Sequence, residues 1–195
     1  MDKEKIASHN SATGERSKTI FHTLMIPFAR CQSKTIKEQL ESGIRLFDIR
    51  IILDTFTDSI KCAHGLWKTD KSAFDILEEI EDYAEQNRDR FYVSIVYEGT
   101  ENEMPKNEFI EMTDLFVDSF KHIKFTYTAY KHSLDNYSRY AYVKQYNQHP
   151  YCVTDFDNLG GDNPHRFFPI PWLWHKLWKN KTDIPDNAYV YRDFV

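Results

Sequence analysis

Basic residues are too few in this chain to give it a positive surface. Its 195 residues include 25 lysines and arginines against 30 aspartates and glutamates, which leaves a formal net charge of −5. Proteins that hold nucleic acid neutralise its phosphates with an excess of lysine and arginine. We therefore expect no nucleic-acid partner.

Cysteines and long apolar runs are also scarce. Cys31, Cys62 and Cys152 lie far apart and form no CxxC pair of the kind that indicates zinc or a redox dithiol, so we expect buried free thiols. No stretch approaches the roughly 20 apolar residues of a membrane span, and the start of the chain lacks the apolar segment of a signal peptide. The sequence predicts a soluble monomer. Its compartment stays open, because a leader that has been removed leaves no trace.

Strand and helix patterns alternate along the chain. Thr35 and Glu38 form a capping-box signal for a helix that stops at Gly43, and a second helix begins at Ser72 and runs to Asn87. Asn107 is the expected cap of a third helix. The expected strands cover residues 6–7, 45–52, 61–63, 91–98, 124–130, 151–154 and 188–194.

This alternation favours an α/β fold, specifically a compact, irregular TIM-barrel-like (β/α) barrel with its site at the carboxyl ends of the strands. Such barrels usually take about 200 or more residues, so some helices should be short or missing. No repeat or linker divides the chain, and we interpret residues 1–195 as a single domain.

Apolar spacing predicts which faces are buried. In the strand over 45–52, a period of two places Phe47, Ile49 and Ile51 on one face and Asp48 and Arg50 on the other. Helical spacing predicts two apolar stripes. These are Phe74, Leu77, Ile80, Tyr83 and Ala84 in the second helix, and Phe109, Met112, Phe116, Val117 and Phe120 in the third.

The residues His9, Arg50 and His64 suggest a chemistry. Cleaving a phosphodiester by acid–base catalysis needs a proton acceptor, a proton donor and a cation that stabilises the charged phosphorane. Two imidazoles and a guanidinium supply these roles. Each residue also has a structural interpretation, as a histidine satisfied in the core or at the surface, or as an Asp48–Arg50 ion pair that only fixes packing.

Five segments together resemble a known family, the X domain of phosphatidylinositol-specific phospholipases C, in its bacterial-type short form. The resemblance rests on their order, and the segments are Ser8-His9-Asn10-Ser11, residues 33–50 with Gln39-Leu40-Glu41-Ser42-Gly43-Ile44-Arg45, Ala63-His64-Gly65, residues 94–98 and Tyr191-Arg192-Asp193-Phe194. The resemblance implies an irregular TIM barrel that acts on phospholipid at a membrane surface. The implied products are diacylglycerol and inositol 1,2-cyclic phosphate.

The resemblance also implies roles for single residues. His9 would be the general base that deprotonates the inositol 2-hydroxyl, His64 the general acid, and Arg50 the phosphate-holding cation. Asp193 would orient His9. Asn10 would lie beside His64 or the phosphate, at a position where metal-independent bacterial members carry aspartate. Candidate substrate contacts are Asp48, Glu98, Asp155 and Asp157.

The resemblance gives a mixed signal about metal. Calcium-dependent members carry an acidic residue where this chain has Arg50, whereas metal-independent bacterial members carry arginine. Yet Asn10, Asp48 and Glu98 match oxygen ligands of the calcium-dependent group. Ca²⁺ takes six to eight oxygens, so three beside a cation make a poor site. We expect no cofactor, with calcium on Asn10, Asp48 and Glu98 as the alternative.

Other functions remain open from the sequence alone. One is a sphingomyelinase D-like or glycerophosphodiesterase-like enzyme that uses Mg²⁺. Another is a weak or inactive barrel that binds lipid headgroups or glycans. The segment over residues 170–179 has Ile170, Leu173, Trp174, Leu177 and Trp178 at helical spacing. It favours a helix packed on the core, with a helix lying at the membrane interface as the alternative.

Overall fold

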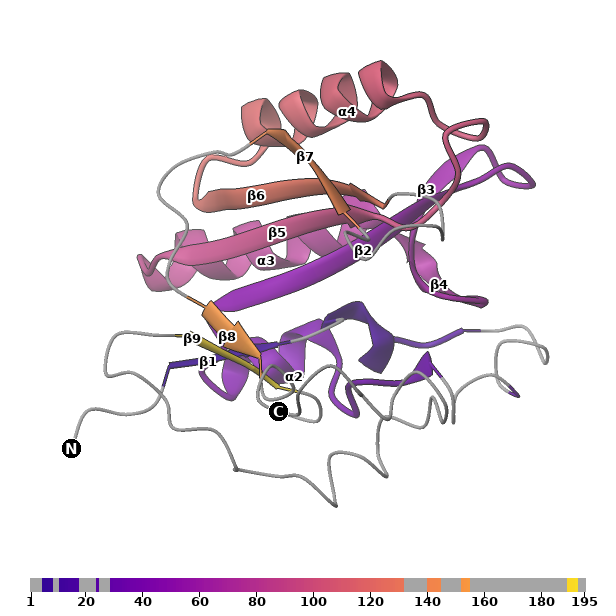
Figure 1. Ribbon diagram of the computed structural model, residues 1–195. Helices are drawn as coiled ribbons and strands as arrows, with labels where there is room; N and C mark the ends of the chain where they lie inside the picture. Colours follow the sequence, from indigo (N-terminus) through magenta and orange to yellow (C-terminus); the bar gives the residue numbers. More distant parts are fainter. Residues whose placement is uncertain are drawn as a thin grey trace.

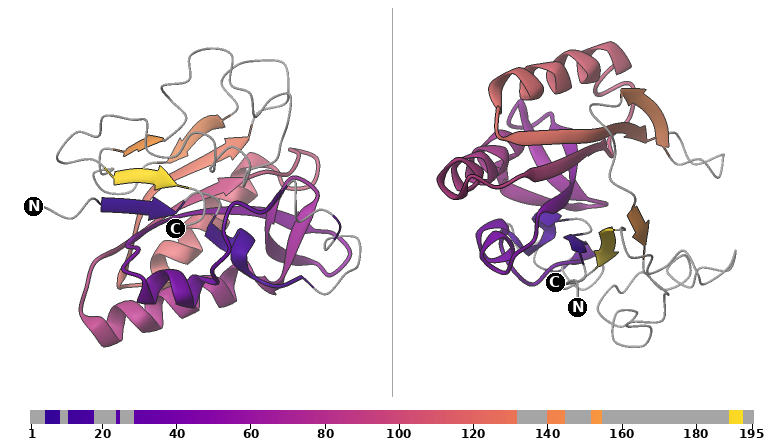
Figure 2. Two further views of the ribbon diagram at one scale, coloured as in Figure 1. Left: turned by 90° about the horizontal axis from the view of Figure 1, so that it is seen from below. Right: turned by 90° about the vertical axis from the view of Figure 1, so that its left-hand side faces the viewer.

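The computed structural model describes residues 5–8, 11–17, 24, 29–131, 140–144, 152–154 and 189–192, with side chains described only among residues 7–125. These residues form one curved sheet with helices packed against it (Figures 1 and 2). The strands are β1 (Lys5–Ser8), β2 (Leu46–Asp54), β3 (Ser59–His64), β4 (Trp67–Ser72), β5 (Phe91–Tyr97), β6 (Ile123–Lys131), β7 (Tyr140–Lys144), β8 (Cys152–Thr154) and β9 (Tyr189–Arg192).

The strand order within the sheet is β7-β6-β5-β2-β1-β9-β8, and a side arm is formed by β3 and β4. The pairs β6–β5, β5–β2, β2–β1, β1–β9 and β9–β8 are parallel. A parallel run of strands linked by helices confirms the predicted α/β class. Among the described residues no pairing joins β7 to β8, so the sheet is open there.

The helices begin where local side-chain caps predict. The helix α2 (Ile36–Glu41) has a complete capping box between Thr35 and Glu38, and α3 (Ala73–Asn87) has one between Ser72 and Asp75. After α2, Gly43 adopts a φ of 93°, a conformation that glycine tolerates at no steric cost. The α4 helix (Lys106–Ser119) packs against β6, while α3 packs against β3, β4 and α2.

The core lies between the sheet and these helices. Phe47, Ile49 and Ile51 on β2 are fully buried in the core, as the period of two predicts. Burying each such side chain stabilises the fold by about 1.5–3 kcal/mol. The opposite face of the same strand carries Asp48 and Arg50. One strand therefore anchors the core and presents the polar site.

Several predictions about the helices and strands were wrong. The cap of α4 is Pro105 rather than Asn107, so the helix begins two residues earlier than predicted. Phe74 is 44% exposed and packs on Phe120 at the edge of the core, while Ala73 and Ile76 take the buried positions in its place. The sequence patterns also missed β4, β7 and the 3₁₀ helix η1 (Ser11–Gly14), which are short or largely polar.

The described helices are all too short or too polar to cross a bilayer. The segment over 170–179, with its tryptophans, lies outside the described residues.

Candidate active site

The candidate site lies along the first half and middle of β2, next to the carboxyl end of β5. In their parallel register Arg50 pairs with Val96 and Ile51 with Tyr97. The next residue, Glu98, donates its backbone N–H to the Ile51 carbonyl at 2.8 Å. This register brings Glu98 beside Arg50, although the two are 48 residues apart in sequence.

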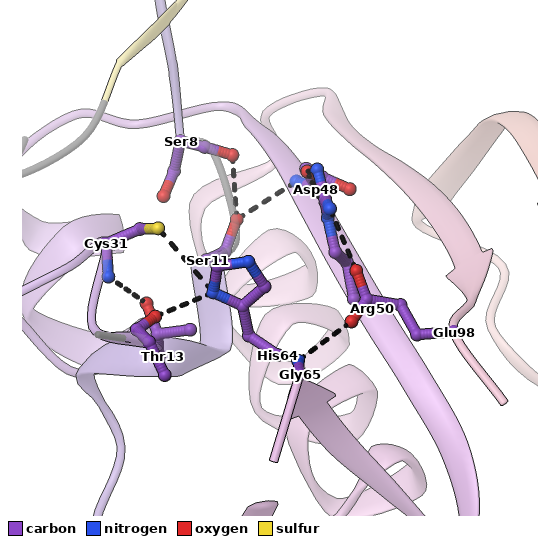
Figure 3. A network of polar contacts seen from close by, with 10 residues as sticks. Ser8, Ser11, Thr13, Cys31, Asp48, Arg50, His64, Gly65 and Glu98 are labelled. Carbon is purple, nitrogen blue, oxygen red and sulfur yellow. Dashed lines mark hydrogen bonds and ion pairs between the residues drawn. The ribbon is translucent and has the colours of Figure 1, made fainter. Parts of the chain in front are cut away.

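Arg50 is held between two carboxylates (Figure 3). Its Nε and Nη2 each donate to Asp48 Oδ2 at 3.1 Å, and its Nη1 donates to Glu98 Oε1 at 2.8 Å. The side chains of Arg50, Asp48 and Glu98 are only 15%, 9% and 4% exposed. The guanidinium stays charged at any physiological pH. The result is a rigid, mostly dehydrated cation at the carboxyl edge of the sheet.

The β3–β4 hairpin brings His64 to this cluster. His64 ends β3, and Gly65 turns the chain with a φ of 59°. The Gly65 N–H donates to Glu98 Oε2 at 3.1 Å, so one carboxylate contacts both Arg50 and the hairpin turn. The half-buried His64 ring contacts the segment before α2 through its Nδ1, which lies 2.7 Å from the Ala29 carbonyl oxygen.

A buried polar network under the site was not predicted from the sequence. Ser11 Oγ donates to the Ser8 carbonyl at 2.9 Å and accepts the Asp48 N–H at 2.9 Å. Gln39 accepts from Ser8 Oγ at 2.6 Å and donates to the Ser11 carbonyl at 2.9 Å. The end of β1, η1, α2 and β2 are thereby joined. The sequence signal for such a role is weak, since serine and glutamine are common everywhere.

The amino-acid sequence of the chain matches a known protein family, independently of the geometry described above. The sequence model of the family "Phosphatidylinositol-specific phospholipase C, X domain" matches residues 10–145, which is well over half of the chain. The chain belongs to this X-domain family. No protein of curated function matches it.

Two solved structures of phosphatidylinositol-specific phospholipases C are similar to the chain. The phosphatidylinositol-specific phospholipase C of Listeria monocytogenes is 19% identical with a TM-score of 0.54, over 79% of this chain and 61% of that one. The enzyme from Staphylococcus aureus is 19% identical with a TM-score of 0.46, over 61% of this chain and 40% of that one. The chain thus spans less than two thirds of either enzyme. The Listeria likeness shows a shared TIM-barrel-like fold.

The structure describes only some of the predicted site residues of this X domain. Asp48, Arg50, His64 and Glu98 lie together, whereas His9, Asn10, Asp155, Asp157 and Asp193 lie outside the described residues. The strands that lead to two of them are paired: Ser8, at the end of β1, lies beside Arg192, at the end of β9. His9 and Asp193 follow these two residues directly in sequence.

Of the three candidate calcium ligands, the structure describes Asp48 and Glu98, and both contact Arg50. Ca²⁺ is held by six to eight oxygens, yet Asp48 and Glu98 both bind the guanidinium of Arg50. Within the described ranges, no cluster of three or more histidine, cysteine, aspartate or glutamate side chains is placed to hold a metal ion. A cation bound at Asp48 and Glu98 would lie next to the positive charge of Arg50.

The side chains of two cysteines are described. Cys31 and Cys62 are buried free thiols, as predicted. Burial raises the pKa of the Cys62 thiol, and the charge of Glu15 raises it further, so Cys62 stays protonated and unreactive at neutral pH.

Proposed function

We propose that the chain is a metal-independent phosphodiesterase that cleaves phosphatidylinositol-like phospholipids to diacylglycerol and inositol 1,2-cyclic phosphate. Family membership supports a phospholipase of this class. The single observation that carries the mechanism is the guanidinium of Arg50, fixed by Asp48 and Glu98 beside the hairpin that bears His64. A preorganised cation of this kind stabilises charge that develops on a phosphorane.

The proposed reaction includes two proton transfers, one from the substrate to His9 and one from His64 to the leaving group. His9 takes the proton of the inositol 2-hydroxyl, and that oxygen attacks phosphorus. The bond from phosphorus to the diacylglycerol oxygen then breaks, and His64 donates a proton to that oxygen. The products are cyclic phosphate and diacylglycerol. His9 is then protonated and His64 neutral, and proton exchange with water returns both histidines to their starting states. Arg50 stays protonated, transfers no proton in this scheme and acts only by its charge.

The remaining predicted residues have supporting roles in this proposal. Asp193 orients His9, and Asn10 lies near His64 or the phosphate. Asp48 and Glu98 hold Arg50 and border the headgroup, and Asp155 contacts a headgroup hydroxyl. Leu66, two residues after His64, is 66% exposed, which supports the approach of this hairpin to an apolar lipid surface.

Phosphorus NMR of phosphatidylinositol micelles tests the proposal directly. The wild-type chain should give a cyclic phosphate signal of equal size with and without EDTA. His9→Ala and His64→Ala should each lower turnover by about a hundredfold or more, the usual contribution of a general acid or base. The matched control is His122→Ala, because His122 is half exposed and precedes β6 at the opposite end of the parallel strands.

Each of the other possible results would point to a different function or mechanism. Activity lost in EDTA would indicate a metal-dependent enzyme, either a calcium-dependent phospholipase C or the sphingomyelinase D-like alternative. Binding to phosphatidylinositol vesicles without any phosphorylated product would indicate a headgroup-binding barrel. Near-normal turnover in both histidine variants would exclude the acid–base mechanism.

A further inference from the structure

The hydrogen bond of His64 fixes which of its nitrogens exchanges protons. Its Nδ1 lies 2.7 Å from the carbonyl oxygen of Ala29. A carbonyl oxygen can only accept, so Nδ1 must carry a hydrogen in both the charged and the neutral ring. Nε2 is then the nitrogen that gains and loses the proton. The Ala29 carbonyl therefore selects the tautomer of His64.

The Ala29 carbonyl belongs to a short segment that Thr13 holds in place. Thr13 Oγ1 accepts the backbone N–H of Cys31 at 3.0 Å and that of Gln32 at 3.0 Å. Thr13, Cys31 and Gln32 are 3%, 2% and 0% exposed, so water does not replace these bonds. Leaving a buried N–H without an acceptor costs about 1–3 kcal/mol. Cys31 adds a second contact to the ring, since its Sγ lies 3.8 Å from His64 Nδ1.

Thr13 also stands on the element that supports the phosphate side of the site. It lies in η1 two residues after Ser11, whose Oγ accepts the Asp48 N–H. One 3₁₀ turn thus fixes the backbone beside Asp48 through Ser11 and the hydrogen-bond partner of His64 through Thr13 (Figure 3). A shift of this turn would move both.

We infer that Thr13 is a positioning residue for His64: its hydroxyl oxygen holds residues 29–32 so that the Ala29 carbonyl keeps the hydrogen on Nδ1 and leaves Nε2 to protonate the leaving oxygen. The catalytic consequence rests on the proposed function. The tautomer itself does not, because it is a property of the free protein.

The test combines nitrogen-15 NMR of the histidine rings with kinetics on the full chain. Thr13→Val keeps the shape but removes the acceptor, and Thr13→Ser keeps the oxygen. We expect Nδ1–H on neutral His64 in the wild type and in Thr13→Val a shift toward Nε2–H. The kcat of Thr13→Val should fall about tenfold to a hundredfold with KM within about twofold, and Thr13→Ser should restore both readings. A His64→Gln variant identifies the His64 signals.

The outcomes separate this inference from the proposed function. Nε2–H in the wild type, or an unchanged tautomer and kcat in Thr13→Val, would overturn the role of Thr13. An inactive wild type whose His64 tautomer still responds to Thr13→Val would refute the proposed function and keep the positioning role. If Thr13→Val does not fold, the wild type decides: Nδ1–H together with slow hydrogen exchange at Cys31 and Gln32 supports the inference, and rapid exchange there overturns it.

Discussion

Removing the positive charge of Arg50 should damage both stability and activity, and the structure allows the two effects to be separated. Arg50→Met keeps most of the aliphatic length but leaves Asp48 and Glu98 without the cation that they share. Both carboxylates are nearly buried, at 9% and 4% side-chain exposure. Breaking a buried ion pair by removing one partner costs about 3–5 kcal/mol, mostly because a charge is left desolvated and unpaired. Typical domains are stable by only about 5–15 kcal/mol, so this variant should be close to unfolding.

The same reasoning predicts a rescue. The triple variant Arg50→Met, Asp48→Asn, Glu98→Gln removes all three charges and keeps the shapes of the side chains. It should regain stability to within about 1–2 kcal/mol of the wild type, since replacing a complete buried ion-pair set by neutral groups is often nearly neutral. It should not regain phosphodiesterase activity, because losing one preorganised charge-stabilising group costs about a hundredfold to a thousandfold in rate.

Urea unfolding and phosphorus NMR provide the two measurements. The matched control is Lys68→Met, which breaks a more exposed ion pair, with Lys68 Nζ 3.4 Å from Asp54 and side-chain exposures of 32% and 18%. Its cost should stay below about 1 kcal/mol. An Arg50→Met variant as stable as Lys68→Met would refute the claim that this cluster is electrostatically buried. An active triple variant would show that the Arg50 charge does not hold the phosphate.

Two further predictions concern the folding of the scaffold. Hydrogen bonds from the Ser72 backbone and side chain lower the pKa of Asp75, so the stability that its charge gives α3 is present near neutral pH and is lost as pH falls below the ordinary carboxyl range. Asp75→Asn should therefore unfold at a lower temperature than the wild type at pH 7, with a gap that closes toward pH 3 in thermal melts; a constant gap would contradict this. Gly14→Ala should destabilise the fold by about 1–3 kcal/mol in urea unfolding, because the new Cβ would lie 1.7 Å from the Lys34 carbonyl oxygen, and a fully stable variant would contradict that close approach.

The sequence predicted most of the local structure because local structure depends on near neighbours. The capping boxes at Thr35 and Ser72 and the alternating faces of β2 are set by residues within a few positions, and the structure confirms them. The errors have the same origin. Phe74 has the right spacing for a buried stripe, but whether a position at the edge of that stripe is covered depends on what packs there from elsewhere in the chain.

The sequence by itself determined the residue types of the site, the family resemblance and the strand that carries Asp48 and Arg50. Tertiary structure alone decided which of these groups meet. Glu98 reaches Arg50 through the register of two parallel strands, and His64 is held by the Ala29 carbonyl 35 residues away. A backbone carbonyl is present at every residue, so no sequence pattern marks the one that a fold places beside an imidazole.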